Sequence, residues 1–259
     1  MATPKQGSQQ LAATEEPPLP ECQPARGGPP TEETPLAPGQ MTTIPWTETE
    51  IAEAKIKCSE ALSSLTLNYE PLPPIKEGLC GAPSPVLLKS LGLNPEVALD
   101  PPATVTCTLA KALSTWLNES VQPQAKALFN SSVTKLHVGS YTCRNRNGGA
   151  DAPLSEHALA NAIDISDFIL ASGERVAVVD SWPSDNPPLP MPNPDRVSSI
   201  SSVKRVSVSL EDPERAFLKS VRDDACGIFG TVLGPGADDA HESHLHLDMK
   251  ERRGGSFCQ

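Results

Sequence analysis

The sequence is poor in aromatic residues, in positive charge and in long apolar runs, and each deficit excludes a class of protein. Aromatic residues make up 4% of the 259 residues, too few for a platform on which single-stranded nucleic acid stacks. The formal net charge of -11 argues against non-specific binding to nucleic acid or to an anionic membrane, because both need a basic surface. No apolar run reaches the ~18 residues that span a bilayer, so no transmembrane segment is predicted.

Closely paired cysteines are also missing, although the chain has seven cysteines. None of them stands in a CxxC pair, the spacing that is typical of many zinc sites and redox enzymes. Cysteines at wide spacing are typical instead of disulfides in an oxidising compartment. The first residues, MATPKQGSQQ, lack the apolar segment of a secretory signal, so we expect that the signal peptide or anchor is missing from this sequence.

Proline marks the segments that we expect to lie outside the core. Residues 1–40 contain nine Pro, four Gly and no aromatic residue, so they cannot bury enough apolar surface to offset the entropy of ordering. We predict a disordered tail over residues 1–45 and interpret it as a spacer, with a proline-rich ligand for a partner domain as the alternative. Six Pro within residues 183–194 predict an exposed loop. Residues 46–259 form the predicted domain.

Periodicity within this domain predicts an α+β fold class, in which helices come first and a small antiparallel sheet flanked by helices follows. Pro123 and Pro213 stand at start positions of predicted helices, where the N–H that proline lacks would be unpaired in any case. A turn at Ser172 and Gly173 predicts a hairpin. The predicted helices cover residues 48–67, 106–117, 123–129, 155–162 and 212–226, and the predicted strands cover residues 133–143, 163–170, 175–179, 203–210 and 244–249.

Histidine is scarce but clustered, which makes it the most informative residue type in the chain. Three of the five histidines, His241, His244 and His246, fall within six residues. Side chains two apart on a strand share a face, so His244 and His246 would point into the same space. His157 lies in a predicted short helix, and Asp164 follows seven residues later at the start of a strand, where both side chains can converge on one site.

Two imidazoles and one carboxylate are the ligand set of a catalytic zinc site, which keeps a position free for water. Zinc in such a site lowers the pKa of its bound water to about 7 and polarises a carbonyl. The same donors also suit iron or manganese. The alternative is that SEHALANAID is a capped helix and that HLHLD is an edge strand with surface histidines. We interpret His137 as a strand surface residue and His241 as a loop residue.

Three separate motifs resemble the extensin-like C-terminal domain family of bacterial envelope proteins. They are SYTCRNRNGG, LSEHALANAIDI and DDACGIFGTVLGPGADDAHESHLHLD, and the likeness covers about Cys58 to Cys258. More distantly, the chain is similar to the superfamily of zinc D-Ala-D-Ala carboxypeptidases, lysostaphin and hedgehog proteins, which implies a hedgehog/DD-peptidase-like fold. The shared signature is SxHxxxxxxD with a later HxH or ExxH. It falls here on Ser155, His157, Asp164, His244 and His246.

This resemblance implies a role for several of these residues. The zinc ligands would be His157, Asp164 and His246, and His244 would orient the water or stabilise the tetrahedral intermediate. Arg144 resembles the arginine that the carboxypeptidases place near the substrate carboxylate or the developing oxyanion, and a guanidinium suits either role. The alternative for Arg144 is a solvated arginine at a strand end.

One position departs from the carboxypeptidase pattern. Three residues before the last ligand, where those relatives carry an acidic general base, this chain has Ser243. If the strand extends back to Glu242, period two places that carboxylate on the same face as His244. Glu242 then substitutes as the base, or His244 takes that role as in the lysostaphin-like relatives, or activity is weak or absent. Ala160 stands where the carboxypeptidase signature has Gly, a change that a helix tolerates.

We expect the cysteines of the predicted domain to form disulfides with one another, with Cys22 assigned to the tail. Many connectivities are possible for the cysteines that remain. A bridge to Cys143 would also fix the strand that presents Arg144. The connectivity that pairs neighbours in sequence joins Cys58 with Cys80, Cys107 with Cys143, and Cys226 with Cys258.

The function that the resemblance implies is that of a zinc peptidase of the periplasm or cell envelope, which hydrolyses amide bonds in peptidoglycan peptide stems. Its cofactor would be Zn²⁺ and its partners would be stem peptides, with no nucleic acid. A rival interpretation is a binding or scaffold module that keeps zinc, or only the fold, without turnover, and Ser243 supports it. A third is a disulfide-rich structural envelope protein without a metal.

Overall fold

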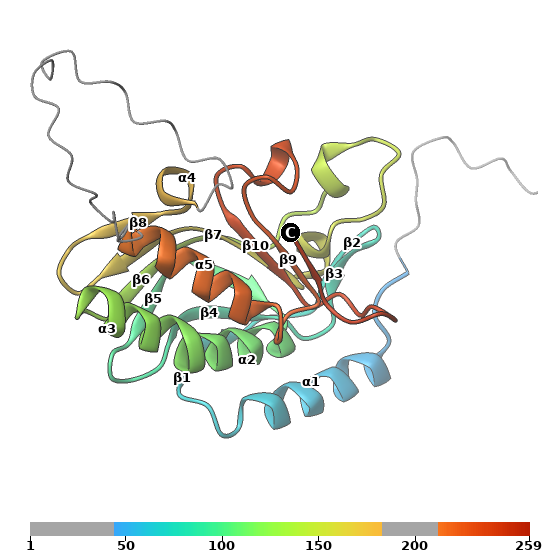
Figure 1. The fold of residues 1–259 in the computed structure, drawn as a ribbon. Coiled ribbons are helices and arrows are strands. Elements are labelled where there is room, and N and C mark those ends of the chain that lie inside the picture. The colour runs from blue at the N-terminus through green and yellow to red at the C-terminus, as the bar shows by residue number, and fades with distance from the viewer. Residues whose placement is uncertain (1–43, 183–211) are drawn as a thin grey trace, which may run out of the picture. The chain divides into compact units, whose positions relative to one another are not determined.

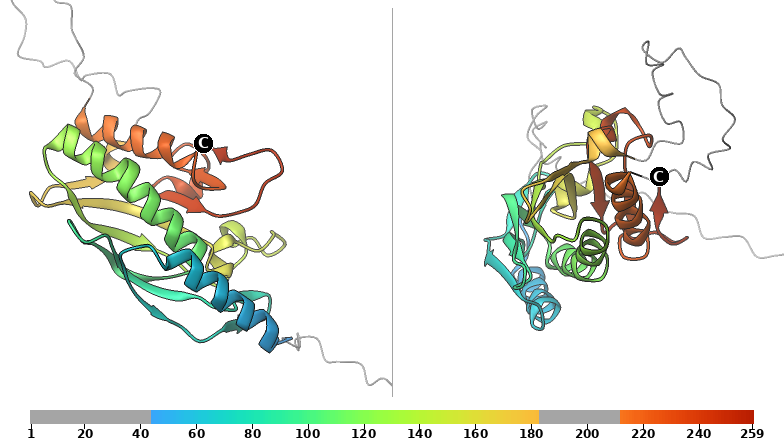
Figure 2. Two further views of the ribbon diagram at one scale, coloured as in Figure 1. Left: turned by 90° about the horizontal axis from the view of Figure 1, so that it is seen from below. Right: turned by 60° about the vertical axis from the view of Figure 1, so that its left-hand side comes forward.

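The computed structural model describes residues 44–182 and 212–259, and within them a large mixed sheet carries helices on one face (Figures 1 and 2). The helices in these ranges are α1 (Glu48–Leu62), α2 (Cys107–Trp116), α3 (Gln122–Phe129), α4 (Val178–Ser181) and α5 (Pro213–Ala225). The strands there are β1 (Leu67–Pro71), β2 (Ile75–Glu77), β3 (Cys80–Ala82), β4 (Val86–Leu91), β5 (Val97–Val105), β6 (Val133–Gly139), β7 (Ala162–Leu170), β8 (Arg175–Ala177), β9 (Thr231–Leu233), β10 (Leu245–Asp248) and β11 (Phe257–Cys258).

The α+β class is confirmed, but the expectation of a small antiparallel sheet is wrong. Among the described residues, nine strands form one sheet in the order β1-β4-β5-β6-β7-β10-β9-β11, with β8 paired to β7, while β2 and β3 pair separately. Strands β5 and β6 are parallel, and so are β9 and β11. A parallel pair needs a long crossover, which α2 and α3, joined by a π-helical turn over Leu117–Val121, supply between β5 and β6.

The strands that precede α2 escaped prediction because their sequence carries conflicting signals. β5 contains Pro101 and Pro102, and proline within a run argues against a central strand because it cannot donate to the ladder. In the structure both prolines are exposed and fall where the pairing of β4 with β5 is irregular. The ladder resumes on either side of that irregularity, so β5 still joins β4 to β6.

The predicted helices at 48–67, 106–117, 123–129 and 212–226 are confirmed with shifted ends, and 163–180 is the predicted hairpin of β7 and β8. The strand predicted over 133–143 ends at Gly139, and that over 244–249 is β10. The tail over residues 1–45, apart from its last two residues, the loop over 183–194 and the strand over 203–210 lie outside the described residues. No helix in the described ranges is long and apolar enough to cross a membrane.

The hydrophobic core lies between the sheet and its helices, and aromatic rings fill its centre. Trp116 of α2 packs edge-on against Phe168 of β7 at 6.2 Å, and Phe168 in turn packs against Phe217 of α5 at 5.1 Å. Trp116 also donates its Nε1–H to the Val221 carbonyl at 2.8 Å. These contacts hold β7 against α2 and α5, and β7 is the strand that carries Asp164.

Three disulfides connect the described residues, and two of the expected pairs are wrong. Cys58 pairs with Cys107, and Cys80 pairs with Cys143, whereas the expected pair of Cys226 with Cys258 is confirmed. Pairing by nearness in sequence fails because α1 packs along α2, which brings the Cα atoms of the first pair within 5.1 Å. The bridge to Cys143 holds the segment that leads to Arg144, although its partner is on β3.

Candidate metal centre

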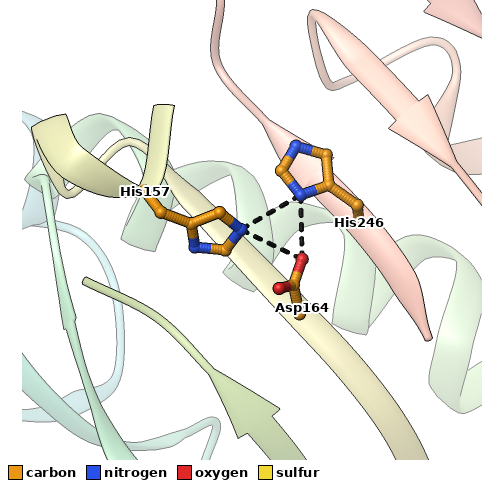
Figure 3. A group of neighbouring side chains, drawn as sticks. All are labelled: His157, Asp164 and His246. Carbon is orange, nitrogen blue, oxygen red and sulfur yellow. Dashed lines mark hydrogen bonds and ion pairs between the residues drawn. The ribbon is translucent and has the colours of Figure 1, made fainter. Parts of the chain in front are cut away.

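Three side chains from separate elements meet at one point on the sheet (Figure 3). Asp164 on β7 and His246 on β10 are directly opposite each other in the antiparallel register, and their Oδ1 and Nδ1 atoms are 2.8 Å apart. His157, in a 3-10 turn over Glu156–Leu159, places its Nε2 atom 3.1 Å from that oxygen and 3.2 Å from that nitrogen. The structure therefore brings together all three residues that the resemblance implied as zinc ligands.

Strand alternation determines on which face of the sheet this group lies. Ile163 and Ile165, which flank Asp164, belong to the hydrophobic core beneath the helices. Leu245 and Leu247 do the same on either side of His246. Because successive strand side chains point to opposite faces, the carboxylate and the imidazole both point away from the helix layer.

The turn that presents His157 is short and ends abruptly. The Ser155 hydroxyl accepts from the His157 backbone N–H at 3.3 Å and caps the turn, as a signature serine before the histidine should. Ala160 then adopts φ 53°, in the left-handed region, and the chain turns into β7. The short helix predicted over 155–162 is present only as this 3-10 turn. The expectation that Ala160 lies in a helix is wrong, because its left-handed conformation is one that favours glycine.

Hydrogen bonds on the far side of each ring fix which nitrogen atoms face the centre. The Ser140 carbonyl accepts from Nδ1 of His157 at 2.8 Å, and the Asp248 carboxylate accepts from Nε2 of His246 at 3.3 Å. When both rings are neutral, each has one N–H, which these bonds hold on the far side, so that the lone pairs lie on Nε2 of His157 and Nδ1 of His246. Both lone pairs point toward the Asp164 carboxylate, an arrangement of acceptors that a cation satisfies.

The donor set and its spacing fit zinc. Tetrahedral zinc with bonds of about 2.0–2.1 Å places neighbouring donor atoms about 3.3 Å apart. The three donor atoms here are separated by 2.8, 3.1 and 3.2 Å, so a small outward movement accommodates the ion. With two nitrogens and one oxygen as ligands, a zinc ion would have one coordination position left for water, and the three residues line a cavity of about 320 Å³.

In the metal-free protein, Asp164 and His246 shift the pKa values of one another. Burial raises the pKa of Asp164, but hydrogen bonds from His157 and His246 outweigh it and hold that pKa well below its usual range. Burial likewise lowers the pKa of His246, but hydrogen bonds to Asp164 and Asp248 outweigh it and raise the pKa to about 9. His246 is therefore protonated at neutral pH until a metal displaces the proton.

Zinc affinity is expected to rise with pH because the metal competes with this proton. Between pH 6.5 and about 9, the pKa of His246, loss of one proton per bound ion makes the association constant increase about tenfold per pH unit, then level off. Titration against a chromophoric chelator at several pH values measures the slope. The stability of the metal-free protein instead falls as the pH rises. Protonated His246 stabilises the fold fully below pH 6.5, and this stabilisation is lost as the pH passes about 9.

Asp248 belongs to the site and was not predicted. It follows His246 at period two in the segment HLHLD, so the alternation that paired His244 with His246 also marked it. It is buried, and burial raises its pKa, but hydrogen bonds from His246, Lys250 and Thr231 together lower that pKa below its usual value. The carboxylate therefore stays charged and holds the ring of His246 in place.

Replacing this carboxylate should weaken metal binding without removing a ligand. Asp248→Asn is expected to lower zinc affinity about 10- to 100-fold, because the amide no longer fixes the N–H of His246 at Nε2. Isothermal titration with zinc measures the loss. Asp239→Asn is the matched control, since Asp239 lies in the 3-10 helix over Asp239–His241 and does not line the cavity. Equal affinity in both variants would show that the bond to Asp248 does not orient the ligand.

His244 and Arg144 lie near the centre but are not in its ligand group. The Nε2 atom of His244 is 3.5 Å from Oδ1 of Asp164, and its side chain is 18% exposed to the cavity. Burial and the neighbouring imidazoles lower the pKa of His244 against the opposing effect of Asp164. Arg144 is exposed and lines the same cavity. Both are placed where a substrate in the cavity would meet them.

The structure does not place Glu242 in the same cavity. β10 begins at Leu245, so the strand does not extend back to Glu242, and the alternation that would put it beside His244 does not apply. Glu242 instead ends the 3-10 helix over Asp239–His241 with helical backbone angles, and its side chain is exposed. It lines a different cavity, together with Trp182 and Arg215.

The two remaining histidines have carboxylate partners of their own. His241 is buried in that 3-10 helix, bonds Asp238 through Nδ1 at 2.6 Å, and lies 5.4 Å from the ring of His244. The expectation of a loop residue is wrong, because His241 lies in a 3-10 helix and lines the cavity, although it is not in the ligand group. His137 on β6 bonds Asp167 through Nδ1 at 3.2 Å and is not in the ligand group.

Comparison with known families agrees with the motifs in these segments. The family model described as "Extensin-like protein C-terminus" matches residues 56–190 and 197–259. No curated protein matches the chain, and neither does any solved structure. The matched residues include every residue of the ligand group and of the strands that carry it.

Proposed function

Because this chain belongs to the extensin-like protein C-terminus family, and because its ligand group faces a cavity, we propose that it is a zinc-dependent peptidase. Its substrate in this proposal is the peptide stem of peptidoglycan, in which it hydrolyses amide bonds. The observation that carries the proposal is the convergence of His157, Asp164 and His246, with the nitrogen lone pairs fixed toward one point. We take the reaction type from the resemblance of Ser155, His157, Asp164, His244 and His246 to the signature of the zinc D-Ala-D-Ala carboxypeptidases.

Zinc would be held by Nε2 of His157, Nδ1 of His246 and the carboxylate of Asp164. When bound, it supplies a Lewis acid for the amide carbonyl and an activated water. The protein's own contribution begins with orientation: the Ser140 carbonyl and the Asp248 carboxylate keep both rings turned toward the cavity.

His244 moves the proton in the proposed reaction. Its Nε2 atom opens on the same cavity as the ligands, and its lowered pKa keeps the ring neutral near pH 7, so that it accepts a proton and returns it to the leaving amine. Arg144 binds the substrate carboxylate or the developing oxyanion from the cavity edge. Glu242 is the alternative base, and it would have to reach the cavity from an exposed position outside β10.

A periplasmic or cell-envelope location is part of the proposal. Its support is the set of disulfides that joins six of the seven cysteines, since such bonds persist in oxidising compartments. One bridge lies beside the site, because Cys143 immediately precedes Arg144.

The alternative function is a binding or scaffold module without turnover. The placement of Ser243 and Glu242 favours it, because no acidic base stands at the position that the carboxypeptidase relatives use and Glu242 does not line the cavity. A module of this kind would bind peptidoglycan and keep the fold, with or without zinc. The two functions therefore differ in product formation, not in binding.

Hydrolysis of purified cross-linked and linear muropeptides by the zinc-loaded protein tests the choice, with new amine and carboxyl ends detected by mass spectrometry. We expect cleavage by the wild type, none by His246→Ala, and retained binding of both proteins to sacculi. Binding to sacculi without cleavage by the zinc-loaded wild type would reject the peptidase and support the scaffold. His137→Ala is the matched control, because His137 lies outside the ligand group.

A further inference from the structure

A row of three side chains crosses the strands beside the metal centre. Thr231 on β9 is directly opposite Asp248 on β10 in one ladder and directly opposite Phe257 on β11 in the other. Directly opposite residues share a face of the sheet, and all three line the cavity that contains His246. Asp248 is also the residue that orients His246, so this row leads from the chain's last strand to a metal ligand.

Arg252 is bound to the middle of this row. Its Nε and Nη2 atoms donate to the Thr231 hydroxyl at 3.2 and 2.9 Å, and its guanidinium lies 5.0 Å from the centre of the Phe257 ring. β11 pairs with β9, and Cys258 next to Phe257 is bridged to Cys226 at the end of α5. The segment between β10 and β11 is thus held at both ends.

The donors and acceptors along this row determine which group donates to which. A guanidinium only donates, so the two bonds from Arg252 occupy the lone pairs of the Thr231 oxygen. The single O–H of Thr231 is left for another acceptor, and the Asp248 carboxylate is directly opposite Thr231 in the ladder of β9 and β10, on the same face of the sheet. Asp248 also accepts from the Lys250 backbone N–H at 2.9 Å and from Nε2 of His246 at 3.3 Å. Its carboxylate is therefore held on every side.

We infer that Arg252 is a positioning residue of the metal centre, which acts through the Thr231 hydroxyl and the Asp248 carboxylate to keep Nδ1 of His246 turned toward the metal. The inference rests on the proposed metal site and extends it to the C-terminal segment. Arg252 lines the cavity but is not in the ligand group. Arg252 orients the hydroxyl of Thr231, and that hydroxyl helps to hold the carboxylate of Asp248. The carboxylate in turn orients the ring of His246.

Simple electrostatics predicts the opposite effect for this arginine. A positive charge near the site disfavours a divalent cation, so removing it should strengthen zinc binding if charge alone matters. Arg253, the next residue, is also exposed and does not line the cavity, which makes it a matched control for charge. The inference predicts that only Arg252→Met weakens binding, while Arg253→Met leaves it unchanged or slightly stronger.

The experiment measures zinc affinity by competition with a chelator on the full chain, together with the visible absorption of the cobalt-loaded protein. Arg252→Met and Thr231→Val are each expected to weaken zinc binding about 3- to 10-fold, less than the loss of Asp248 itself, and to change the cobalt spectrum. Thr231→Ser keeps the hydroxyl and should retain wild-type affinity and spectrum. A purely structural role for Thr231 would not distinguish Ser from Val in this way.

A double-mutant cycle tests the path. In the Asp248→Asn background, Arg252→Met should cause no further loss, because its effect passes through that carboxylate. Equal losses in both backgrounds, or unchanged zinc affinity and cobalt spectrum in Arg252→Met, would overturn the inference. Absence of zinc binding by the wild type would instead overturn the metal site, so the two failures are distinguishable. Melting of each metal-free variant verifies that it is folded.

Discussion

Purified without added metal or chelator, the chain is expected to carry about one zinc per molecule, and the His157→Ala variant almost none. The physical reason is that His157 supplies one of the three donor atoms. Without it, only Asp164 and His246 remain, and their donor atoms are hydrogen-bonded to each other at 2.8 Å. Two ligands bind a metal ion much more weakly than three. Metal content by mass spectrometry, per mole of protein, measures the difference.

His137→Ala is the control for this variant, since it removes an imidazole that stands outside the ligand group. It should retain the zinc of the wild type. Equal metal content in His157→Ala and the wild type would place the metal elsewhere in the chain. If neither protein holds metal and zinc added at about micromolar concentration fails to bind, the peptidase proposal falls and the scaffold leads.

The ligand group could be predicted from a motif, and local spacing contributed only part of it. His246 and Asp248 alternate along β10, and strand period alone puts them on one face, while His244 stands just before the strand. The position of Asp164 opposite His246 depends on the register between β7 and β10, and the spacing of residues within one strand does not determine that register. There the resemblance contributed, because it named Asp164 as a partner of a later HxH. The convergence of three elements was thus predictable by motif and not by periodicity.

The parts that escaped prediction depend on contacts between distant segments. The position of α1 along α2 decides the partner of Cys58, and no local pattern in α1 records it. The width of the sheet depends on β4 and β5, and the two prolines of β5 are typical of a loop rather than of a central strand. The role of Glu242 depends on where the strand begins, which the alternation of side chains does not define, and β10 begins three residues after Glu242.

His244→Ala is expected to separate metal binding from turnover. His244 supplies no atom to the ligand group, so the variant should keep about one zinc per chain. If its Nε2 atom moves the proton in the proposed hydrolysis, kcat on muropeptides should fall about 10²- to 10⁴-fold. Metal analysis and steady-state kinetics on the same preparation measure both quantities.

Glu242→Gln is the decisive companion, because Glu242 is the other candidate for the base. The exposed turn that carries it lines a separate cavity, so this variant should hydrolyse muropeptides at close to the wild-type rate. The reverse pattern, with Glu242→Gln inactive and His244→Ala active, would assign the base to Glu242 and require the turn before β10 to move toward the metal. Because both variants leave His157, Asp164 and His246 in place, either result identifies the proton carrier without disturbing the ligands.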